Sequence, residues 1–240
     1  MSDIPELSVV ILCYRSGLSI IEFAKKAEEI AARIASSYEI ILVGNYLEGS
    51  DDDTADIVQK LALENPFYKS VSKPKRGMMG WDMKEGLRLT SGRYICVIDG
   101  DGQFPLESIE SCFSLIKTGK YDLVKTYRKK RNDGFYRNLI SKVYNFIFSL
   151  LFPGIHSKDT NSKPKIFSRK AYELMNLQSD DWFIDAEIML KIKEHHLVFH
   201  EIPVEFFKLE GRGSFVKFQA ILEFIRNLIK FKMQELKRKK

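Results

Sequence analysis

Residues 94–103 read Tyr-Ile-Cys-Val-Ile-Asp-Gly-Asp-Gly-Gln, a largely apolar run that ends in two aspartates. Such a run followed by a polar turn is typical of a strand buried in a parallel sheet. If the backbone stays extended beyond this strand, Asp99, Asp101 and Gln103 point to one side, because side chains alternate with a period of two. The stretch therefore predicts a buried strand with two carboxylates and an amide at its carboxyl end.

Short β-branched runs alternate with helical patterns on both sides of this strand. Upstream, residues 7–12 and 38–43 are expected to be strands, and each is followed by apolar residues at helical spacing. Further strands are expected at 69–72, 121–125, 165–167 and 196–202. This alternation predicts an α/β fold, a Rossmann-like and mostly parallel sheet flanked by helices. In such folds ligands bind at the carboxyl ends of the strands, where the two aspartates are expected to lie.

The chain has 240 residues, of which 45% are hydrophobic and 29% charged, as expected for a globular domain with a full core. Its formal charge is +6, and residues 217–240 alone carry eight Lys or Arg against two Glu, so the first 216 residues are neutral. A basic surface that covers the protein and binds nucleic acid is therefore not expected. We expect one unit made of a domain over residues 1–216 and a basic amphipathic helix over 217–240.

The side chains at the end of the quoted strand suit a hard metal ion. Carboxylate and amide oxygens are ligands that Mg²⁺ or Mn²⁺ prefers, and water and phosphate oxygens complete the shell. A calcium loop of the EF-hand type is a second interpretation, because Glu110 falls at the twelfth position counted from Asp99. However, Phe104 stands where that loop requires glycine. A solvated acidic turn after a core strand is the third interpretation.

Several short motifs follow one another along the chain. Arg76-Gly77 opens a predicted helix, and residues 99–105 read Asp-Gly-Asp-Gly-Gln-Phe-Pro. Further pieces lie at 137–141, 159–162, 182–187, 201–204 and 212–214. In order and spacing these motifs resemble the family 2 glycosyltransferases of the GT-A fold, and most closely the dolichyl- or polyprenyl-phosphate sugar synthases within that family.

The resemblance implies an inverting transfer of a sugar from a nucleotide-sugar donor to a lipid phosphate. A divalent cation, Mg²⁺ or Mn²⁺, would be held by Asp99, Asp101 and Gln103, and would neutralise charge that develops on the departing nucleoside diphosphate. A lipid phosphate is already ionised at pH 7, so it needs little help from a general base. The residues that the resemblance assigns to donor or phosphate binding are Tyr14, Glu48, Arg76, Gly77, Asp99, Arg128, Ser141 and Arg212.

Three residues are expected to take part in the chemistry itself. Asp101 would hold the metal, and Arg137 would place positive charge beside the acceptor phosphate, a role that suits the rigid guanidinium fork. Asp185 falls where many family members keep an acidic residue near the acceptor, so it is the candidate base or acceptor-orienting group. An acidic residue that merely stabilises the start of a helix is an equally good interpretation of Asp185.

Two segments depart from the family pattern. Residues 12–16 keep only Tyr14 of the usual Pro-x-Tyr-Asn-Glu, and residues 44–50 replace Asp-Asp-Gly-Ser, leaving Asn45 and Glu48 as substitutes. These segments hold the nucleobase in relatives, so the base stays open. Two alternatives to the main hypothesis therefore remain, a glycosyltransferase with a saccharide acceptor and a non-catalytic module that binds a nucleotide sugar or a membrane.

Two amphipathic segments, residues 136–152 and 215–231, combine aromatic and aliphatic residues with neighbouring Lys and Arg. This pattern favours binding to an anionic membrane surface, although both segments could instead pack on the core. Residues 1–6 show no apolar signal segment, and no apolar run reaches the roughly 20 residues of a spanning helix. We therefore expect a cytoplasmic protein that is peripheral on the cytoplasmic face of a membrane, and the oligomeric state stays open.

Overall fold

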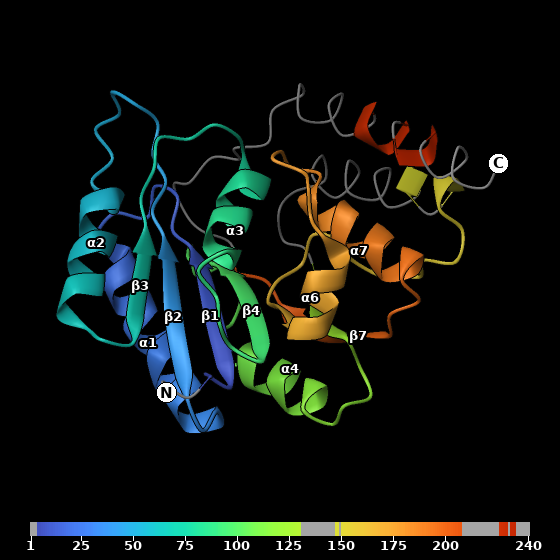
Figure 1. Ribbon diagram of the computed structural model, residues 1–240, viewed down its shortest axis with the longest axis horizontal. Coiled ribbons are helices and arrows are strands. Elements are labelled where there is room, and N and C mark those ends of the chain that lie inside the picture. Colours follow the sequence, from blue (N-terminus) through green and yellow to red (C-terminus); the bar gives the residue numbers. More distant parts are fainter. Residues whose placement is uncertain (1–3, 131–146, 149, 208–225, 230, 234–240) are drawn as a thin grey trace.

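The computed structural model describes residues 4–130, 147–148, 150–207, 226–229 and 231–233 (Figure 1). The strands are β1 (Leu7–Leu12), β2 (Tyr38–Val43), β3 (Tyr68–Val71), β4 (Tyr94–Asp99), β5 (Leu123–Lys130), β6 (Lys165–Ser168) and β7 (Phe199–Glu205). The helices are α1 (Ser19–Ile34), α2 (Thr54–Glu64), α3 (Met79–Leu87), α4 (Ser108–Ile116), α6 (Arg169–Met175) and α7 (Ile184–Glu194). The predicted strands are all present, with ends that differ by a few residues.

The seven strands form one sheet in the order β3-β2-β1-β4-β6-β5-β7. The strands from β3 to β4 pair in parallel, and β7 pairs in parallel with β5. Strand β6 lies antiparallel between β4 and β5. The predicted α/β fold with a mostly parallel sheet is therefore confirmed, and β6 is the strand that runs against its neighbours.

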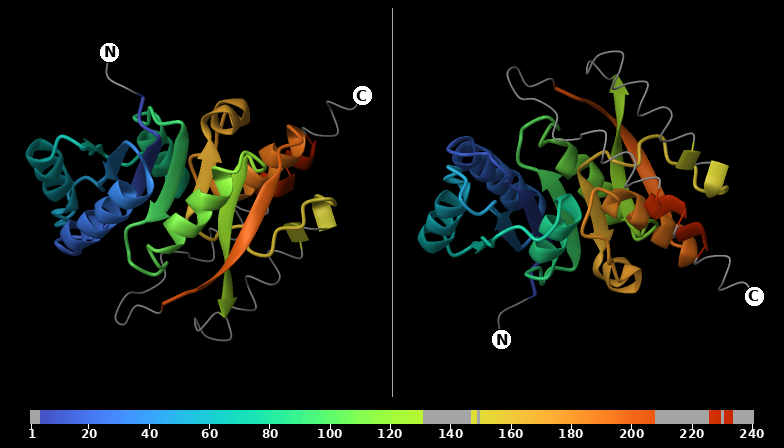
Figure 2. Two further views of the ribbon diagram at one scale, coloured as in Figure 1. Left: turned by 90° about the horizontal axis from the view of Figure 1, so that it is seen from below. Right: turned by 90° about the horizontal axis from the view of Figure 1, so that it is seen from above.

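Helices cover both faces of the sheet, as the two views of Figure 2 show. Helices α1, α2 and α4 pack on one face against residues such as Val9 and Ile11 of β1. Helices α3, α6 and α7 pack on the other face, where Val10 and Leu12 of the same strand point. Because every second residue of β1 faces a different layer, a strand covered on both sides must be apolar throughout. This burial explains why the inner strands read as continuous hydrophobic runs.

The chain between the two aspartates is held flat against β1. The Gly100 N–H donates to the Leu12 carbonyl at 2.9 Å. A Cβ atom at Gly100 would lie 2.9 Å from Ile20 Cδ1 and 3.0 Å from Ile11 Cγ2, so only glycine fits without displacement. The close approach of Gly100 to β1 and α1 fixes the positions of the flanking residues Asp99 and Asp101.

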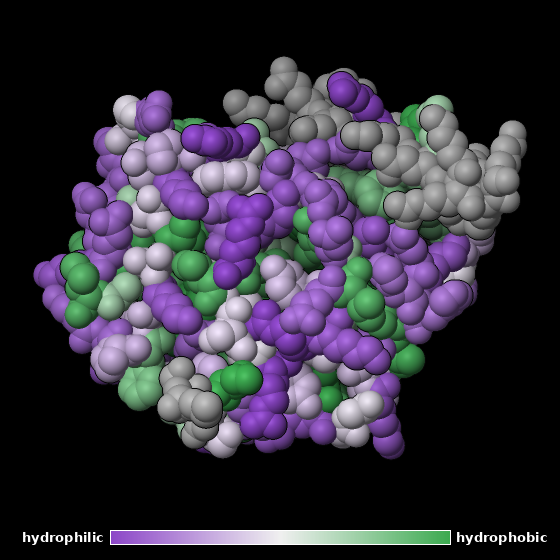
Figure 3. Space-filling view, viewed as in Figure 1, coloured by the Kyte–Doolittle hydropathy of each residue, from purple (hydrophilic) through white to green (hydrophobic). Residues whose placement is uncertain are grey.

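The described parts of the two amphipathic segments lie on the α7 side of the molecule, and they contact each other. Lys232 Nζ lies 5.3 Å from the centre of the Phe152 ring, and the Phe231 ring lies 5.4 Å from that of Phe183. Phe148 and Leu228 are buried. On the face drawn in Figure 3, apolar residues are dispersed among hydrophilic ones. Within the described ranges, no helix is both long enough and apolar enough to cross a bilayer.

Candidate functional site

The candidate site lies at the carboxyl ends of the central strands. Asp99 ends β4, Tyr14 follows β1, and Asn45 follows β2. The antiparallel strand β6 brings a second segment to the same edge, because Val97 of β4 pairs with Lys165 at the beginning of β6. The residues that precede Lys165 therefore continue alongside Asp99. The site is built from segments that are distant in sequence.

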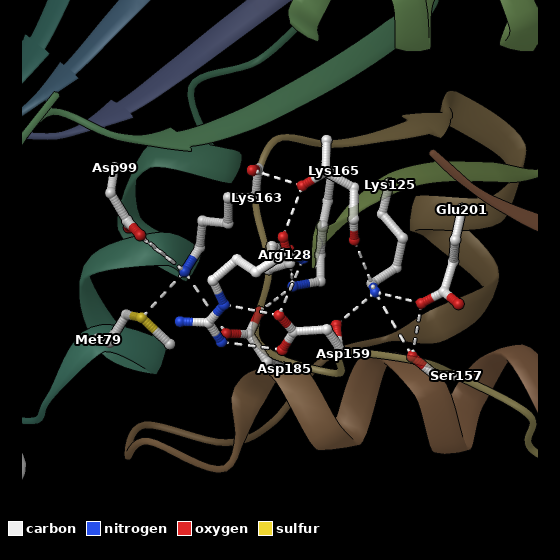
Figure 4. Close-up of polar contacts among 12 residues, drawn as sticks. Met79, Asp99, Lys125, Arg128, Ser157, Asp159, Lys163, Lys165, Asp185 and Glu201 are labelled. Atoms are coloured by element: carbon white, nitrogen blue, oxygen red, sulfur yellow. Dashed lines mark hydrogen bonds and ion pairs between the residues drawn. The ribbon is translucent and has the colours of Figure 1, made fainter. Parts of the chain in front are cut away.

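Lys163 reaches Asp99 from this neighbouring segment (Figure 4). The Lys163 side chain is 2% exposed, and its Nζ lies 3.3 Å from both carboxylate oxygens of Asp99. The same Nζ lies 3.4 Å from an Asp185 oxygen and 3.2 Å from Met79 Sδ. Burial alone would lower the pKa of Lys163, but the Asp185 and Asp99 carboxylates raise it above its ordinary value. The ammonium of Lys163 is therefore charged and shared between two carboxylates.

Asp185, at the first turn of α7, is enclosed by lysines. Its side chain has no exposed surface, and its Oδ1 accepts a hydrogen bond from Lys165 Nζ at 2.7 Å. Burial would raise the pKa of Asp185, but the charges of Lys163 and Lys165 outweigh it and hold that pKa below its ordinary value. Burial also lowers the pKa of Lys165 to about 8, against the opposing effect of Asp185. Asp185 is thus an ionised internal carboxylate.

Two further buried ion pairs continue from this cluster (Figure 4). Lys125 of β5 has no exposed surface and donates to Glu201 of β7 at 2.7 Å and to the Asp159 carbonyl at 2.6 Å. Arg128 binds Asp159 with both arms of its fork, at 2.6 Å through Nε and 2.9 Å through Nη2. The Arg128 guanidinium also lies 5.0 Å from the centre of the Phe206 ring. Arg128 is therefore turned toward a carboxylate of the protein.

The cluster is electrically balanced. It contains four cationic side chains, Lys125, Arg128, Lys163 and Lys165, and four carboxylates, Asp99, Asp159, Asp185 and Glu201. Among the described residues, no buried side-chain nitrogen or oxygen lacks a hydrogen-bond partner. Buried charges are tolerated only when they are paired and hydrogen-bonded. We refer to these eight residues as the buried charge cluster.

The backbone turns immediately after Asp99, so the expectation of an extended chain through Gln103 is wrong. Asp101 Oδ1 accepts a hydrogen bond from the Gln103 N–H at 3.0 Å, and Gly102 has a φ of +73°. The Gln103 amide nitrogen donates to the Phe207 carbonyl at 3.2 Å. The alternation argument fails because the local turn satisfies the backbone. Gln103 as a third metal ligand stays a prediction.

Without Gln103, the two carboxylates Asp99 and Asp101 suit a metal ion that also binds a phosphate ligand. Asp99 and Asp101 offer hard oxygen atoms on a backbone that Gly100 fixes, and the Asp99 side chain is 27% exposed. No group of three or more His, Cys, Asp or Glu residues in the described ranges could hold a metal ion alone. Mg²⁺ is usually held by one or two carboxylates, with water and substrate phosphates completing its shell. The residues therefore fit Mg²⁺ or Mn²⁺.

Arg76 and Gly77 lie at the start of α3 in contact with the turn that precedes α7. A Cβ atom at Gly77 would lie 2.7 Å from the Asp180 carbonyl oxygen, so this position requires glycine. The Met78 and Trp81 N–H groups donate to the same carbonyl at 2.7 and 3.1 Å. The turn thus occupies backbone donors at the start of α3, and Arg76 lies exposed beside it.

Glu187 on α7 holds that turn in place. Its two oxygens accept hydrogen bonds from the Gln178 and Ser179 N–H groups at 2.9 and 2.8 Å, and its side chain is fully buried. The two acidic residues of α7 therefore have separate structural partners. Asp185 binds the lysines of the buried charge cluster, whereas Glu187 supports the turn that packs against α3.

The two segments that depart from the family pattern meet around Asp82. Asn45 is buried and donates to Asp82 at 2.9 Å, and Lys75 forms an ion pair with the same carboxylate. Lys75 Nζ lies 4.4 Å from the centre of the Tyr14 ring. Burial raises the pKa of Asp82, and the Lys75 charge opposes this effect. Glu48 is exposed in the loop that follows Asn45.

The other predicted site residues, Arg137, Ser141 and Arg212, lie outside the described residues, and their roles stay predictions. Sequence reasoning missed Lys125, Lys163 and Lys165, although a signal was present. Lys125 and Lys165 belong to predicted strands, and Lys163 precedes one of them. A lysine within a buried strand needs a carboxylate partner, so these positions indicated internal ion pairs.

Comparisons with known proteins agree with this geometry. The family model described as Glycosyl transferase family 2 matches residues 8–180, more than half of the chain. A dolichyl-phosphate beta-glucosyltransferase from Trichomonas vaginalis is 26% identical over 182 residues, which are 70% of this chain and 52% of that protein. An undecaprenyl-phosphate 4-deoxy-4-formamido-L-arabinose transferase from Pseudomonas syringae pv. syringae is 31% identical over 141 residues, 58% of this chain and 40% of that protein. The chain thus spans about half or less of these relatives.

Solved structures share the fold. Glucosyl-3-phosphoglycerate synthase from Mycobacterium tuberculosis in complex with UDP gives a TM-score of 0.72 at 17% identity, over 94% of this chain and 79% of that chain. The same synthase with Mn²⁺, UDP and phosphoglyceric acid gives a TM-score of 0.69 at 16% identity, over 94% and 76%. At these identities the likeness establishes the GT-A fold and nothing finer.

Replacing Asp185 with Asn should lower the free energy of unfolding at pH 7 by about 3–5 kcal/mol, because two buried lysines lose their shared carboxylate. The folded-state pKa of Asp185 is lowered, so its stabilisation is full above the ordinary carboxyl pKa of about 4 and is lost as pH falls through the folded value. The difference between wild type and Asp185→Asn should therefore narrow below about pH 4. Urea denaturation across this pH range measures it.

Asp180→Asn is the matched control, since Asp180 pairs with Lys84 but its side chain is 55% exposed. We expect a loss of about 0–1 kcal/mol for this variant at pH 7. Two results would contradict the assignment of Asp185 as an internal ion-paired carboxylate. One is equal stability of Asp185→Asn and Asp180→Asn, and the other is a stability difference between wild type and Asp185→Asn that does not change with pH.

Proposed function

Because the chain belongs to glycosyltransferase family 2, we propose that it transfers a sugar from a nucleotide-diphosphate donor to a polyprenyl phosphate. The observation that carries the proposal is the pair of carboxylates, Asp99 and Asp101, which Gly100 fixes at the carboxyl end of β4. This edge is where ligands of open α/β sheets bind. Two relatives named for lipid-phosphate substrates support the acceptor class.

In the proposed reaction an oxygen of the acceptor phosphate attacks the anomeric carbon, and the bond from that carbon to the donor diphosphate breaks. Asp99 and Asp101 would hold Mg²⁺ or Mn²⁺, which would neutralise the diphosphate as it leaves. An attack from the face opposite the diphosphate gives inversion. The protein's task is to place the two phosphate-bearing substrates in line and to balance their negative charge.

The burial of Asp185 favours a phosphate acceptor over a sugar hydroxyl. A hydroxyl needs a general base within hydrogen-bond reach, whereas a phosphate monoester is already ionised at pH 7. Asp185, the candidate base, has no exposed surface and is paired with Lys165. We infer that Asp185 acts through the lysines that it positions. The base and diphosphate of the donor would lie near Tyr14, Arg76 and Glu48.

Cationic residues would bind the acceptor phosphate. We assign this role to Arg137 and Arg212, with Ser141 as a hydrogen-bond donor, since guanidinium groups match phosphate geometry. Arg128 is held by Asp159, and its guanidinium lies 5.9 and 5.0 Å from the centres of the Phe104 and Phe206 rings. A phosphate contact by Arg128 would use the guanidinium N–H groups that do not bind Asp159.

We also propose that the protein binds the cytoplasmic face of a membrane through the surface formed by the described parts of residues 147–152 and 226–233. Buried Phe148 and Leu228 anchor this surface to the core, and Leu150 and Ile229 are 69% and 50% exposed on it. Exposed apolar side chains near basic residues are suited to an anionic lipid interface. A lipid-phosphate acceptor would be met at that interface.

A nucleoside diphosphate together with Mn²⁺ should raise the thermal midpoint by about 5–10 °C at a hundredfold excess over Kd. UDP, GDP, CDP and dTDP would be compared, each with Mn²⁺ and with EDTA. The Mn²⁺-dependent increment should disappear in Asp101→Ala and persist in Glu107→Ala, which removes an exposed carboxylate from the same stretch of chain. Absence of a shift with every nucleotide in the folded wild type would contradict the donor site.

Arg137→Ala should lower transfer to polyprenyl phosphate about a hundredfold while leaving nucleotide binding unchanged, since one cation that faces the acceptor is lost. The assay uses the nucleotide sugars of the base identified by the thermal shifts, with polyprenyl phosphate in detergent as acceptor. Arg93→Ala is the control, because Arg93 is exposed at the amino end of β4, opposite the proposed site. Equal transfer by both variants would exclude the lipid-phosphate assignment of Arg137.

The variant that combines Leu150→Asp and Ile229→Asp should bind anionic vesicles at least about tenfold more weakly than the wild type, because two exposed apolar side chains become charged. Flotation with vesicles of phosphatidylcholine and phosphatidylglycerol measures the bound fraction. Leu63→Asp is the control, since Leu63 is 88% exposed on α2, away from this surface. Loss of binding in both variants, or in neither, would contradict the proposed membrane surface.

A further inference from the structure

We propose that Lys163 is a resident cation of the donor site, and that its ammonium and a divalent metal ion compete for Asp99. The inference rests on the proposed donor site and adds to it a residue that controls how tightly metal binds. It also predicts that a nucleoside diphosphate binds in the absence of metal, because the Lys163 ammonium supplies positive charge beside the diphosphate.

The geometry places the Lys163 ammonium where it neutralises Asp99. Its Nζ is 3.3 Å from both Asp99 oxygens, and the lysine side chain is only 2% exposed. The segment that precedes β6 delivers it there, since β6 begins opposite Val97 of β4. A cation centred between two carboxylate oxygens occupies a position that a metal ion bound by the same carboxylate would also use.

A second carboxylate allows Lys163 to withdraw from Asp99 without losing its counter-charge. Asp185 Oδ2 lies 3.4 Å from Lys163 Nζ on the inner side. Asp185 already receives a short hydrogen bond of 2.7 Å from Lys165. The Lys163 ammonium can therefore move toward Asp185 when a metal ion approaches Asp99, and the partly exposed Asp99 can exchange one cation for the other.

Competition follows from the charges. With Lys163 beside it, Asp99 contributes little net negative charge, and a divalent ion a few ångströms from an ammonium is repelled. Metal should therefore bind weakly to the protein alone. A nucleoside diphosphate adds negative charge that both cations can share, so metal should bind more tightly once the nucleotide is present. The buried charge cluster thus sets the order in which the ligands bind.

The test is a direct titration of the full chain with Mn²⁺ alone, followed by the electron paramagnetic resonance signal of the free aquo ion. Lys163→Met keeps the unbranched side chain up to the position of Cε and removes the charged Nζ, and this variant should bind Mn²⁺ at least about tenfold more tightly than the wild type. Lys75→Met is the matched control, because the Lys75 side chain is only 7% exposed and pairs with Asp82 at the same sheet edge. This variant should change Mn²⁺ affinity by less than about twofold. An unchanged or weaker affinity in folded Lys163→Met overturns the proposal.

Circular dichroism and the thermal midpoint establish that the variants fold, and Lys163→Gln, which retains a hydrogen-bond donor, replaces Lys163→Met if the latter does not. A second titration uses the four nucleoside diphosphates in EDTA. Wild type should bind one of them, and Lys163→Met should bind it at least about tenfold more weakly, since the diphosphate loses its nearest cation. If a nucleotide binds in the presence of Mn²⁺ and the two proteins bind it equally in EDTA, the proposal is also overturned.

The Mn²⁺ and nucleotide titrations distinguish a failure of the role of Lys163 from a failure of the proposed donor site. If no nucleotide binds under any condition while Lys163→Met binds Mn²⁺ more tightly, the donor proposal fails and the competition for Asp99 stands. If a nucleotide binds with Mn²⁺ and the metal affinity of Lys163→Met equals that of the wild type, the donor proposal stands and the role of Lys163 is refuted.

Discussion

The need of a buried ammonium for a carboxylate determines the architecture around this site. Three lysines, Lys125, Lys163 and Lys165, lie at most 2% exposed where β4, β6, β5 and β7 meet α7, and each has an acidic partner. The direction of β6 makes this arrangement possible. A parallel strand would place the residues before it at the amino edge of the sheet, whereas antiparallel β6 places them beside the end of β4. The reversed strand therefore couples the edge that carries the proposed metal site to the second half of the chain.

The buried charge cluster contributes more to the uniqueness of the folded arrangement than to the net free energy of unfolding. Desolvation of eight charges offsets much of the attraction between them, so an apolar core of the same volume could be equally stable. What the pairs do enforce is position, because a shift of α7 or β6 would leave an ammonium without its carboxylate. Asp185 thus holds Lys163 and Lys165, and Lys163 also contacts Asp99, which supports a positioning role for Asp185 in the proposed site.

The fold was predictable from the sequence because its signals are local. The continuous apolar run that ends at Asp99 identifies a strand covered on both faces, and the structure confirms it. The reversal of β6 and the position of Lys163 were not predictable, since both depend on pairing between β4 and a strand about 70 residues further along the chain. The local turn at Asp101 and Gly102 redirects Gln103, whose amide then donates to Phe207, more than 100 residues away. Sequence patterns predicted which sheet edge carries Asp99 and Asp101, and long-range pairing decided which other side chains lie there.

The two segments that depart from the family pattern remain an ordered part of this edge. Asn45, where the family keeps an acidic residue, accepts a hydrogen bond from the Lys73 N–H and donates one to Asp82. Asp82 is neutralised by Lys75, whose ammonium lies over the ring of Tyr14. Tyr14 from the first altered segment and Asn45 from the second are thus joined through one buried carboxylate and one lysine. These contacts among Asn45, Asp82, Lys75 and Tyr14 support the proposal of a donor site with changed nucleobase recognition.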